Sequence, residues 1–105
     1  MISSSPTSET VAVVGSGLIG ASWIALFLAQ GMTVHAWDPN PEALQTLRAR
    51  VRVAMRQLRQ LGRRGHGRLM IERELAKALV GVDFVQENAP ESLKLKRALY
   101  DTKPM

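Results

Sequence analysis

The sequence predicts an α/β fold in which helices flank an incomplete, mainly parallel, doubly wound sheet of about four strands. Short apolar runs alternate with helical patterns, and a glycine-rich turn follows the first run directly. The 105 residues suffice for one compact domain, and 46% hydrophobic with 22% charged residues is ordinary for a chain that buries a core. Helices that join parallel strands form right-handed crossovers, which restricts the topology further.

The first part of the chain predicts two strands with a helix between them. The β-branched run Thr10–Val14 suits a strand that is buried on both faces. A helix is expected over residues 21–30, with Gly31 as its stop, and a second strand over Thr33–Trp37.

A long helix is expected to begin at Pro41, because the missing N–H of proline costs nothing at the first helical position. Six apolar residues then form one stripe over five turns, which is typical of a helix packed against a core: Leu44, Leu47, Val51, Ala54, Leu58 and Leu61. Residues 62–67, rich in glycine and arginine, are expected to form a flexible connection.

The last part of the chain predicts shorter elements. They are a strand over residues 69–71, a helix over residues 72–80 that Gly81 ends, a strand over residues 82–86, and a helix from Pro90 towards Asp101. Residues 1–9 are expected to form a disordered tail, so that the domain covers residues 10–105.

The formal net charge of +5 is concentrated in residues 43–71, which hold eight arginines and no acidic residue. Most of these arginines lie off the apolar stripe, and a solvated helix face explains them. Alternatively, Arg52, Arg56 and Arg59 pair with the phosphates of a CoA-like substrate. A nucleic-acid-binding module is a third interpretation, but no aromatic residues are interleaved with the arginines, and we expect no nucleic-acid partner.

The residue types exclude several kinds of site. The absence of cysteine excludes a disulfide-stapled domain, a thiolate nucleophile and a cysteine zinc site. Neither His35 nor His66 has a carboxylate or serine at a spacing typical of a catalytic pair. No histidines and acids show metal-ligand spacing, so we expect no metal.

The start of the chain lacks the pattern of a secretory signal, and we expect a cytoplasmic protein. Residues 11–29 are uncharged and long enough to span a bilayer, which stays open as an alternative. Three glycines early in this window, and β-branched residues that stop within it, favour a strand followed by a buried helix. We therefore expect no membrane partner.

The glycine-rich turn lies between the first predicted strand and helix. Gly15 permits a tight turn, Gly17 allows a pyrophosphate to approach the backbone, and Gly20 allows the helix to pack close to the sheet. The unpaired N–H groups of the first helical turn would then meet the phosphate charge. We predict a Rossmann-type dinucleotide site made by Gly15, Ser16, Gly17, Leu18, Ile19 and Gly20. A turn that closes this corner without a ligand is the alternative.

Asp38 follows the second predicted strand, eighteen residues beyond Gly20. A carboxylate there accepts hydrogen bonds from the adenosine ribose of a bound dinucleotide. Its charge also repels a 2′-phosphate, so NAD is the expected cofactor rather than NADP. Arg48 is ten residues downstream and is not an obvious ligand for a 2′-phosphate.

Three segments resemble the N-terminal, NAD-binding domain of the 3-hydroxyacyl-CoA dehydrogenase family: residues 11–20, 38–42 and 83–97. The third is the most specific, because family members carry an acid-rich turn after the fourth strand and then a helix of the form Glu-x-Leu-x-x-Lys. The resemblance implies that Glu91 and Lys96 contact the nicotinamide half of NAD. A first-turn acid and a solvated lysine without a ligand are the alternative.

The resemblance further implies an oxidoreductase, in fatty acid metabolism, that transfers a hydride between NAD and the 3-hydroxy carbon of a hydroxyacyl-CoA or a small hydroxy acid. Family members are homodimers whose catalytic serine, histidine–glutamate pair and asparagine lie beyond this domain. The sequence ends at Met105, before those positions. We therefore expect this chain to bind NAD without turning over substrate, and it contains no predicted catalytic residue.

Two features separate the sequence from the acyl-CoA enzymes of the family. Residues 86–91 are more similar to the branch that acts on small hydroxy acids, such as carnitine and gulonate dehydrogenases. The acyl-CoA enzymes also hold CoA with a serine and a lysine on the long second helix, where this chain has Ala54 and Leu61. Carnitine- or gulonate-type chemistry is therefore one alternative, and a non-catalytic nucleotide-binding module is another.

Overall fold

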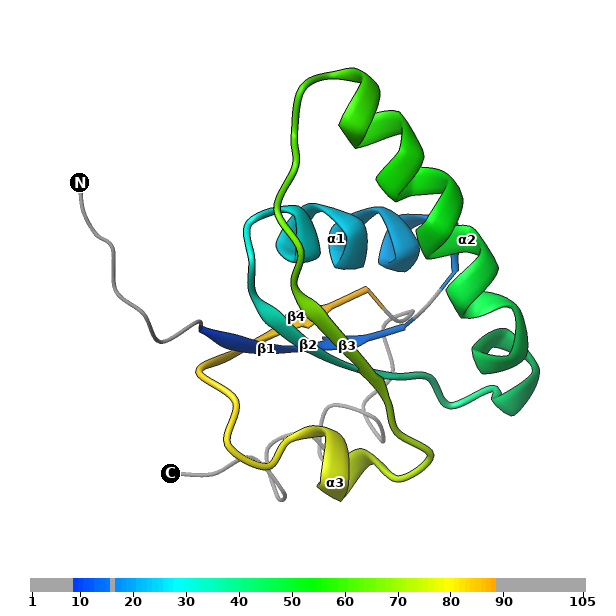
Figure 1. The fold of residues 1–105 in the computed structure, drawn as a ribbon. Helices are drawn as coiled ribbons and strands as arrows, with labels where there is room; N and C mark the ends of the chain where they lie inside the picture. Colours follow the sequence, from blue (N-terminus) through cyan, green and yellow to red (C-terminus); the bar gives the residue numbers. More distant parts are fainter. Residues whose placement is uncertain (1–8, 16, 89–105) are drawn as a thin grey trace.

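The structure, a computed structural model that describes residues 9–15 and 17–88, contains a parallel sheet with the strand order β3-β2-β1-β4 (Figure 1). The elements are β1 (Thr10–Val14), α1 (Leu18–Ala29), β2 (Thr33–Trp37), α2 (Pro41–Gln60), β3 (Arg68–Ile71), α3 (Leu75–Ala78) and β4 (Phe84–Glu87). The chain winds outward from β1 to β3 and then returns past β1 to β4, so the winding direction reverses between β1 and β4. The predicted α/β, doubly wound class is confirmed.

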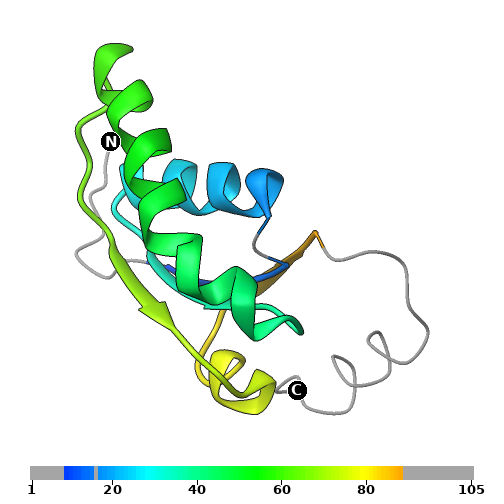
Figure 2. The same ribbon diagram turned by 90° about the vertical axis from the view of Figure 1, so that its right-hand side faces the viewer.

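The sheet is covered on both faces, by α1 and α2 on one side and by α3 on the other (Figure 1 and Figure 2). The central strand β1 supplies both cores, because successive side chains point to opposite faces. Val11 and Val13 belong to the core under α1 and α2, whereas Ala12 and Val14 pack with Leu79 on the α3 side. These four side chains are fully buried, as expected for a central parallel strand.

Helix α1 begins at Leu18, three residues before the predicted start. The motif glycine Gly20 therefore lies within the first helical turn. Its missing side chain lets that turn pack closely on the end of β1. Gly31 ends the helix as predicted and has a φ of +84°, which favours glycine. No helix within residues 9–15 and 17–88 has the length and hydropathy needed to cross a membrane.

Helix α2 begins at Pro41 as predicted, and the Asn40 side chain accepts a hydrogen bond from the Glu42 N–H at 3.0 Å. The apolar stripe is buried only in its first half, at Leu47 and Val51. Leu61 lies just beyond the helix and is 79% exposed. The second half of α2 extends beyond α1 (Figure 1 and Figure 2), and its stripe residues Ala54 and Leu58 are only half-buried.

The connection over residues 62–67 packs against the end of α1 at two of its glycines. The Gly67 N–H donates to the Leu28 carbonyl oxygen at 2.8 Å. A Cβ on Gly65 would lie 1.8 Å from the Ala29 carbonyl oxygen, and one on Gly67 would lie 2.0 Å from that of Met32. These glycines therefore permit a close approach of two backbones, a role that the sequence alone did not indicate.

The predicted helix over residues 72–80 is shortened to the single turn α3. Its first part is held at the sheet instead, because the Glu72 N–H donates to the Ala36 carbonyl oxygen at 2.9 Å. Strand β4 starts two residues later than the predicted 82–86. Just before β4, the Asp83 N–H donates to the Thr10 carbonyl oxygen at 2.7 Å. Asp83 Oδ2 in turn accepts the Thr10 N–H at 2.7 Å.

Two predicted segments fall largely outside the described residues. They are the helix that starts at Pro90 and the tail over residues 1–9, of which only Glu9 is described. The Glu9 carbonyl oxygen accepts the Thr33 N–H at 3.0 Å, just before β1 and β2 begin to pair.

Candidate functional site

The loops after β1, β2 and β4 meet at the carboxyl edge of the sheet. The Gly15 N–H donates to the carbonyl oxygen of Trp37, the last residue of β2, at 2.8 Å. On the other side, the Asn88 N–H donates to the Val14 carbonyl oxygen at 2.7 Å. The glycine turn, Asp38 and Asn88 are thereby brought to the point of winding reversal, where doubly wound folds bind ligands.

The glycines of the turn have separate structural roles. Gly15 has a φ of +94°, which L side chains rarely adopt. A Cβ on Gly20 would lie 2.0 Å from the Gly15 carbonyl oxygen, so α1 reaches β1 only because residue 20 has no side chain. A Cβ on Gly17 would meet no atom of the described residues within 4 Å, so the space beside it is open to them.

The start of α1 offers hydrogen-bond donors to this open space. The first helical bond runs from the Ala21 N–H to the Gly17 carbonyl oxygen at 2.9 Å. The N–H groups of the three preceding residues have no acceptor within the helix, and the positive end of the helix dipole lies there. Leu18 and Ile19 are 75% and 69% exposed, so this turn faces outward. Open space and unpaired donors fit a diphosphate group.

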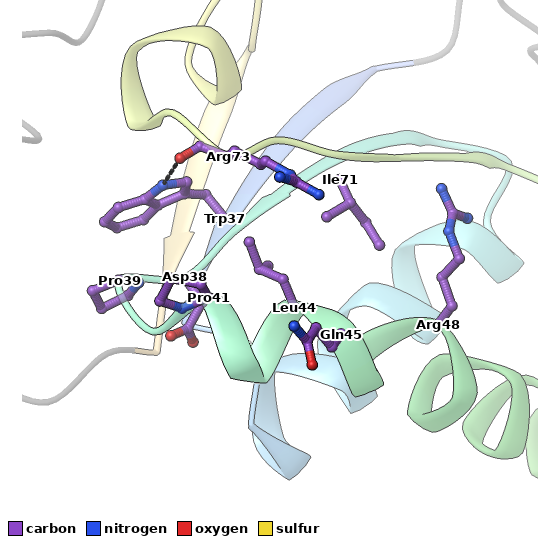
Figure 3. Close-up of a pocket in the computed structure, with 9 residues that line it drawn as sticks. All are labelled: Trp37, Asp38, Pro39, Pro41, Leu44, Gln45, Arg48, Ile71 and Arg73. Atoms are coloured by element: carbon purple, nitrogen blue, oxygen red, sulfur yellow. Dashed lines mark hydrogen bonds between the residues drawn. The ribbon is translucent and has the colours of Figure 1, made fainter.

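Asp38 lies at the carboxyl end of β2, and its Oδ1 accepts the Asn40 N–H at 2.7 Å. This local turn fixes the orientation of the carboxylate. Asp38 also lines a cavity of about 560 Å³ between β2, β3 and the start of α2, a size typical of small-molecule sites (Figure 3). Asp38 thus directly follows the second strand, as the sequence predicts.

Two arginines line the same cavity as Asp38. Arg48 comes from α2 and Arg73 from the loop after β3, and the apolar side chains of Leu44 and Ile71 line the cavity with them (Figure 3). Arg48 therefore lines the same cavity as Asp38, although ten residues separate the two along the chain. Arg73 was not singled out from the sequence, because its position depends on the pairing of β3 with β2.

Asn88 is a polar residue at the crevice to which the sequence analysis assigned no role. Its Oδ1 accepts a hydrogen bond from Gln86 Nε2 at 3.3 Å. Its Nδ2 is shielded from solvent and has no hydrogen-bond partner in the described part of the chain. A Cβ on Gly20 would lie 3.9 Å from this Nδ2, which places the amide beside the glycine turn. Its place directly after the fourth predicted strand was the sequence feature that could have indicated a position at the crevice.

Other ionisable and aromatic side chains, on β2, α1 and α3, make structural contacts. His35 Nδ1 lies 3.0 Å from the Ala78 carbonyl oxygen and ties β2 to α3. On α1, Phe27 is buried, whereas Trp23 is 37% exposed and stacks on Phe27 with ring centroids 5.6 Å apart. The hydrogen bond and charge of Glu74 raise the pKa of Lys77 on the surface of α3. Within residues 9–15 and 17–88, no cluster of histidines and acids could hold a metal ion.

The predicted contacts of the nicotinamide half, Glu91 and Lys96, lie outside the described residues, as does Ser16 of the glycine turn. The three arginines considered for CoA phosphates, Arg52, Arg56 and Arg59, are all exposed on α2. The structure therefore brings together the glycine turn and Asp38 from the predicted set, and it adds Asn88 and Arg73 to their surroundings.

Known proteins match nearly the whole chain. The family model for the 3-hydroxyacyl-CoA dehydrogenase, NAD binding domain, matches residues 10–103. The L-carnitine dehydrogenase of Streptomyces griseus subsp. griseus is 47% identical over 92 residues, which are 85% of this chain and 28% of that protein. The L-carnitine dehydrogenase of Pseudomonas aeruginosa is 44% identical over 95 residues, 88% of this chain and 30% of that protein. The chain thus spans less than a third of these curated relatives.

Solved structures share the fold. A 5-formyl-3-hydroxy-2-methylpyridine 4-carboxylic acid 5-dehydrogenase, described as an NAD⁺ dependent dismutase, matches with a TM-score of 0.78 and 30% identity, over 91% of this chain and 32% of that chain. The (S)-3-hydroxybutyryl-CoA dehydrogenase of Ralstonia eutropha matches with a TM-score of 0.66 and 23% identity, over 90% of this chain and 35% of that chain. With its reversing sheet, its glycine turn and these matches, the chain belongs to the 3-hydroxyacyl-CoA dehydrogenase family of NAD-dependent oxidoreductases and corresponds to its Rossmann-type, NAD-binding domain.

Proposed function

We propose that the crevice between β1, β2 and β4 holds NAD through the residues singled out from the sequence. The set is Gly15, Ser16, Gly17, Leu18, Ile19 and Gly20 at the diphosphate, Asp38 at the adenosine ribose, and Glu91 and Lys96 at the nicotinamide half. The observation that carries the proposal is the open space around the Cβ position of Gly17, the N-cap of α1, where no described side chain caps the helix. Bound NAD would supply the hydride acceptor of the reaction.

Each part of the set has a distinct physical task. The backbone donors of the first α1 turn stabilise the negative diphosphate without adding a side chain to the site. The Asp38 carboxylate accepts hydrogen bonds from ribose hydroxyls, and such charged bonds contribute on the order of 1.5–3 kcal/mol each. Gly20 keeps α1 close to β1, so that the donors and the carboxylate share one edge of the sheet.

For the complete protein, we propose an NAD-dependent dehydrogenase that acts on a small hydroxy acid of the carnitine type. The relatives with 47% and 44% identity are L-carnitine dehydrogenases, which supports this branch. The resemblance to the acyl-CoA enzymes is weak where they hold CoA, since Ala54 and Leu61 carry no group that binds a phosphate. On the family resemblance, we also propose a cytoplasmic homodimer and a catalytic histidine outside this domain, so that this chain alone binds NAD without turnover.

Asp38→Asn is expected to weaken NAD binding by about tenfold and to strengthen NADP binding, because it removes the negative charge. The asparagine keeps an Oδ1 that accepts the Asn40 N–H, so the local turn is preserved. Calorimetric titration of the purified chain with NAD and with NADP measures both effects. An absence of saturable NAD binding to the unsubstituted chain would refute the proposed function while leaving the fold intact.

The exposed arginines of α2 favour one second candidate, an acyl-CoA substrate held through its phosphates. A triple variant, with Arg52, Arg56 and Arg59 changed to glutamine, distinguishes an acyl-CoA substrate from a small hydroxy acid. With a small hydroxy acid as substrate, the unsubstituted chain shows no saturable binding of acetyl-CoA, and the triple variant keeps its NAD affinity. Salt-sensitive acetyl-CoA binding that the triple variant loses would instead establish the acyl-CoA branch.

A further inference from the structure

We infer that Asn88 is a further cofactor-binding residue, and that its Nδ2 donates a hydrogen bond to a diphosphate oxygen of NAD. The inference rests on the proposed function, because it assigns a new residue to the crevice in which NAD is proposed to lie. It concerns the side of the crevice opposite to Asp38. There the backbone of Asn88 joins β4 to the end of β1.

The position of the amide is fixed from three directions. The Asn88 N–H donates to the Val14 carbonyl oxygen at 2.7 Å, which anchors the backbone at the point of winding reversal. Gln86 Nε2 donates to Oδ1 at 3.3 Å, so the other end of the amide, Nδ2, points away from Gln86. Nδ2 lies 3.9 Å from the place of a Cβ on Gly20, beside the first turn of α1.

The amide nitrogen is left without an acceptor, which is uncommon for a buried polar atom. Nδ2 is shielded from water and has no hydrogen-bond partner in the described ranges. A purely structural asparagine would use both ends of its amide, because an unpaired buried donor destabilises the fold. Here one end is held by Gln86, and the free end lies beside Gly20, in the first turn of α1.

A diphosphate is the acceptor that fits this donor. Its oxygens are negatively charged and only accept, and hydrogen bonds to charged acceptors are the stronger class. The donors at the start of α1 come from one side of the crevice, and Asn88 would add one from the β4 side. The diphosphate would then be held between the start of α1 and the end of β4.

Asn88→Leu tests this assignment, since leucine has a similar size and no polar atom. We expect the dissociation constants for both NAD and ADP to rise about tenfold or more, because both ligands carry the diphosphate. Without ligand, the thermal midpoint should stay the same or rise, because an unpaired buried donor has been removed. Gln57→Leu, the same kind of change at an exposed position of α2, should alter neither quantity.

Asn88→Asp keeps an acceptor for Gln86 and replaces the donor with a negative oxygen, so it should weaken both ligands by more than the leucine variant does. Three results would overturn the inference. The first is unchanged binding of both ligands with a lowered midpoint, which would make Asn88 structural. The second is a loss for NAD but not for ADP, which would place the acceptor outside the diphosphate. The third is an asparagine-to-aspartate variant that binds normally. If the unsubstituted chain binds no NAD at all, the proposed function itself fails.

Discussion

Gly20→Ala is expected to destabilise the domain by about 3 kcal/mol, at the upper end of the usual cost of overpacking. The added Cβ would lie 2.0 Å from the Gly15 carbonyl oxygen and 2.9 Å from its carbonyl carbon. Both are backbone atoms, which cannot rotate away as a side chain can, so α1 must move off β1. For a domain of this size, the thermal midpoint followed by circular dichroism should fall by on the order of 15 °C.

Gly17→Ala is the matched control within the same motif. Its φ of −52° suits an L residue, and its Cβ would meet no atom within 4 Å. The midpoint should therefore change little, whereas the dissociation constant for NAD should rise, because the methyl group would occupy the open space. Equal losses of stability in the two variants would show that the turn packs differently. A Gly17→Ala variant with full NAD affinity would place the diphosphate elsewhere.

The glycine turn was predictable because its chemistry is local. Spacing within six residues, between a β-branched run and a helical pattern, already indicates a tight turn, a close helix and an exposed backbone. Asp38 was predictable for a related reason, since the end of β2 lies beside the end of β1 in any parallel unit of this kind. In both cases the position depends on no more than the pairing of two neighbouring strands, β1 and β2.

The features that the sequence did not reveal depend on contacts between distant segments. Arg73 reaches the cavity beside Asp38 only because β3 pairs with β2. Asn88 reaches the glycine turn only because the chain returns past β1 to form β4. The helix expected over residues 72–80 was too long because Glu72 bonds to Ala36, a contact that no periodicity within the segment indicates.

The apolar stripe of α2 shows a second kind of limit. Its spacing was predicted correctly, and the helix is present, but spacing does not say how much of a face is covered. Coverage depends on the lengths of α1 and the sheet, and these end before α2 does (Figure 2). Leu61 is exposed for this geometric reason, although it continues the same stripe as the buried Leu47.

Gly67→Ala is expected to destabilise the domain by about 2–4 kcal/mol, through overpacking and the loss of a backbone hydrogen bond. The added Cβ would lie 2.0 Å from the Met32 carbonyl oxygen and 3.0 Å from the Leu28 Cα. Displacement of this residue would break the bond from its N–H to the Leu28 carbonyl oxygen, 2.8 Å long, and the bond from the Arg68 N–H to Met32, 3.1 Å long. Chemical denaturation and hydrogen exchange at Gly67 and Arg68 measure the loss.

Gly62→Ala separates this close approach from a simple preference for glycine. Gly62 has a φ of +88° but nothing within 4 Å of its Cβ position, so its replacement should cost only about 1 kcal/mol of backbone strain. If Gly67 serves close packing, its variant should lose more stability than the Gly62 variant, and exchange should accelerate first in β3, the edge strand. Equal losses of stability in the Gly62 and Gly67 variants, or unchanged hydrogen exchange at the Arg68 amide, would contradict a packing role for Gly67. Strand β3 would then be held by its pairing with β2 alone.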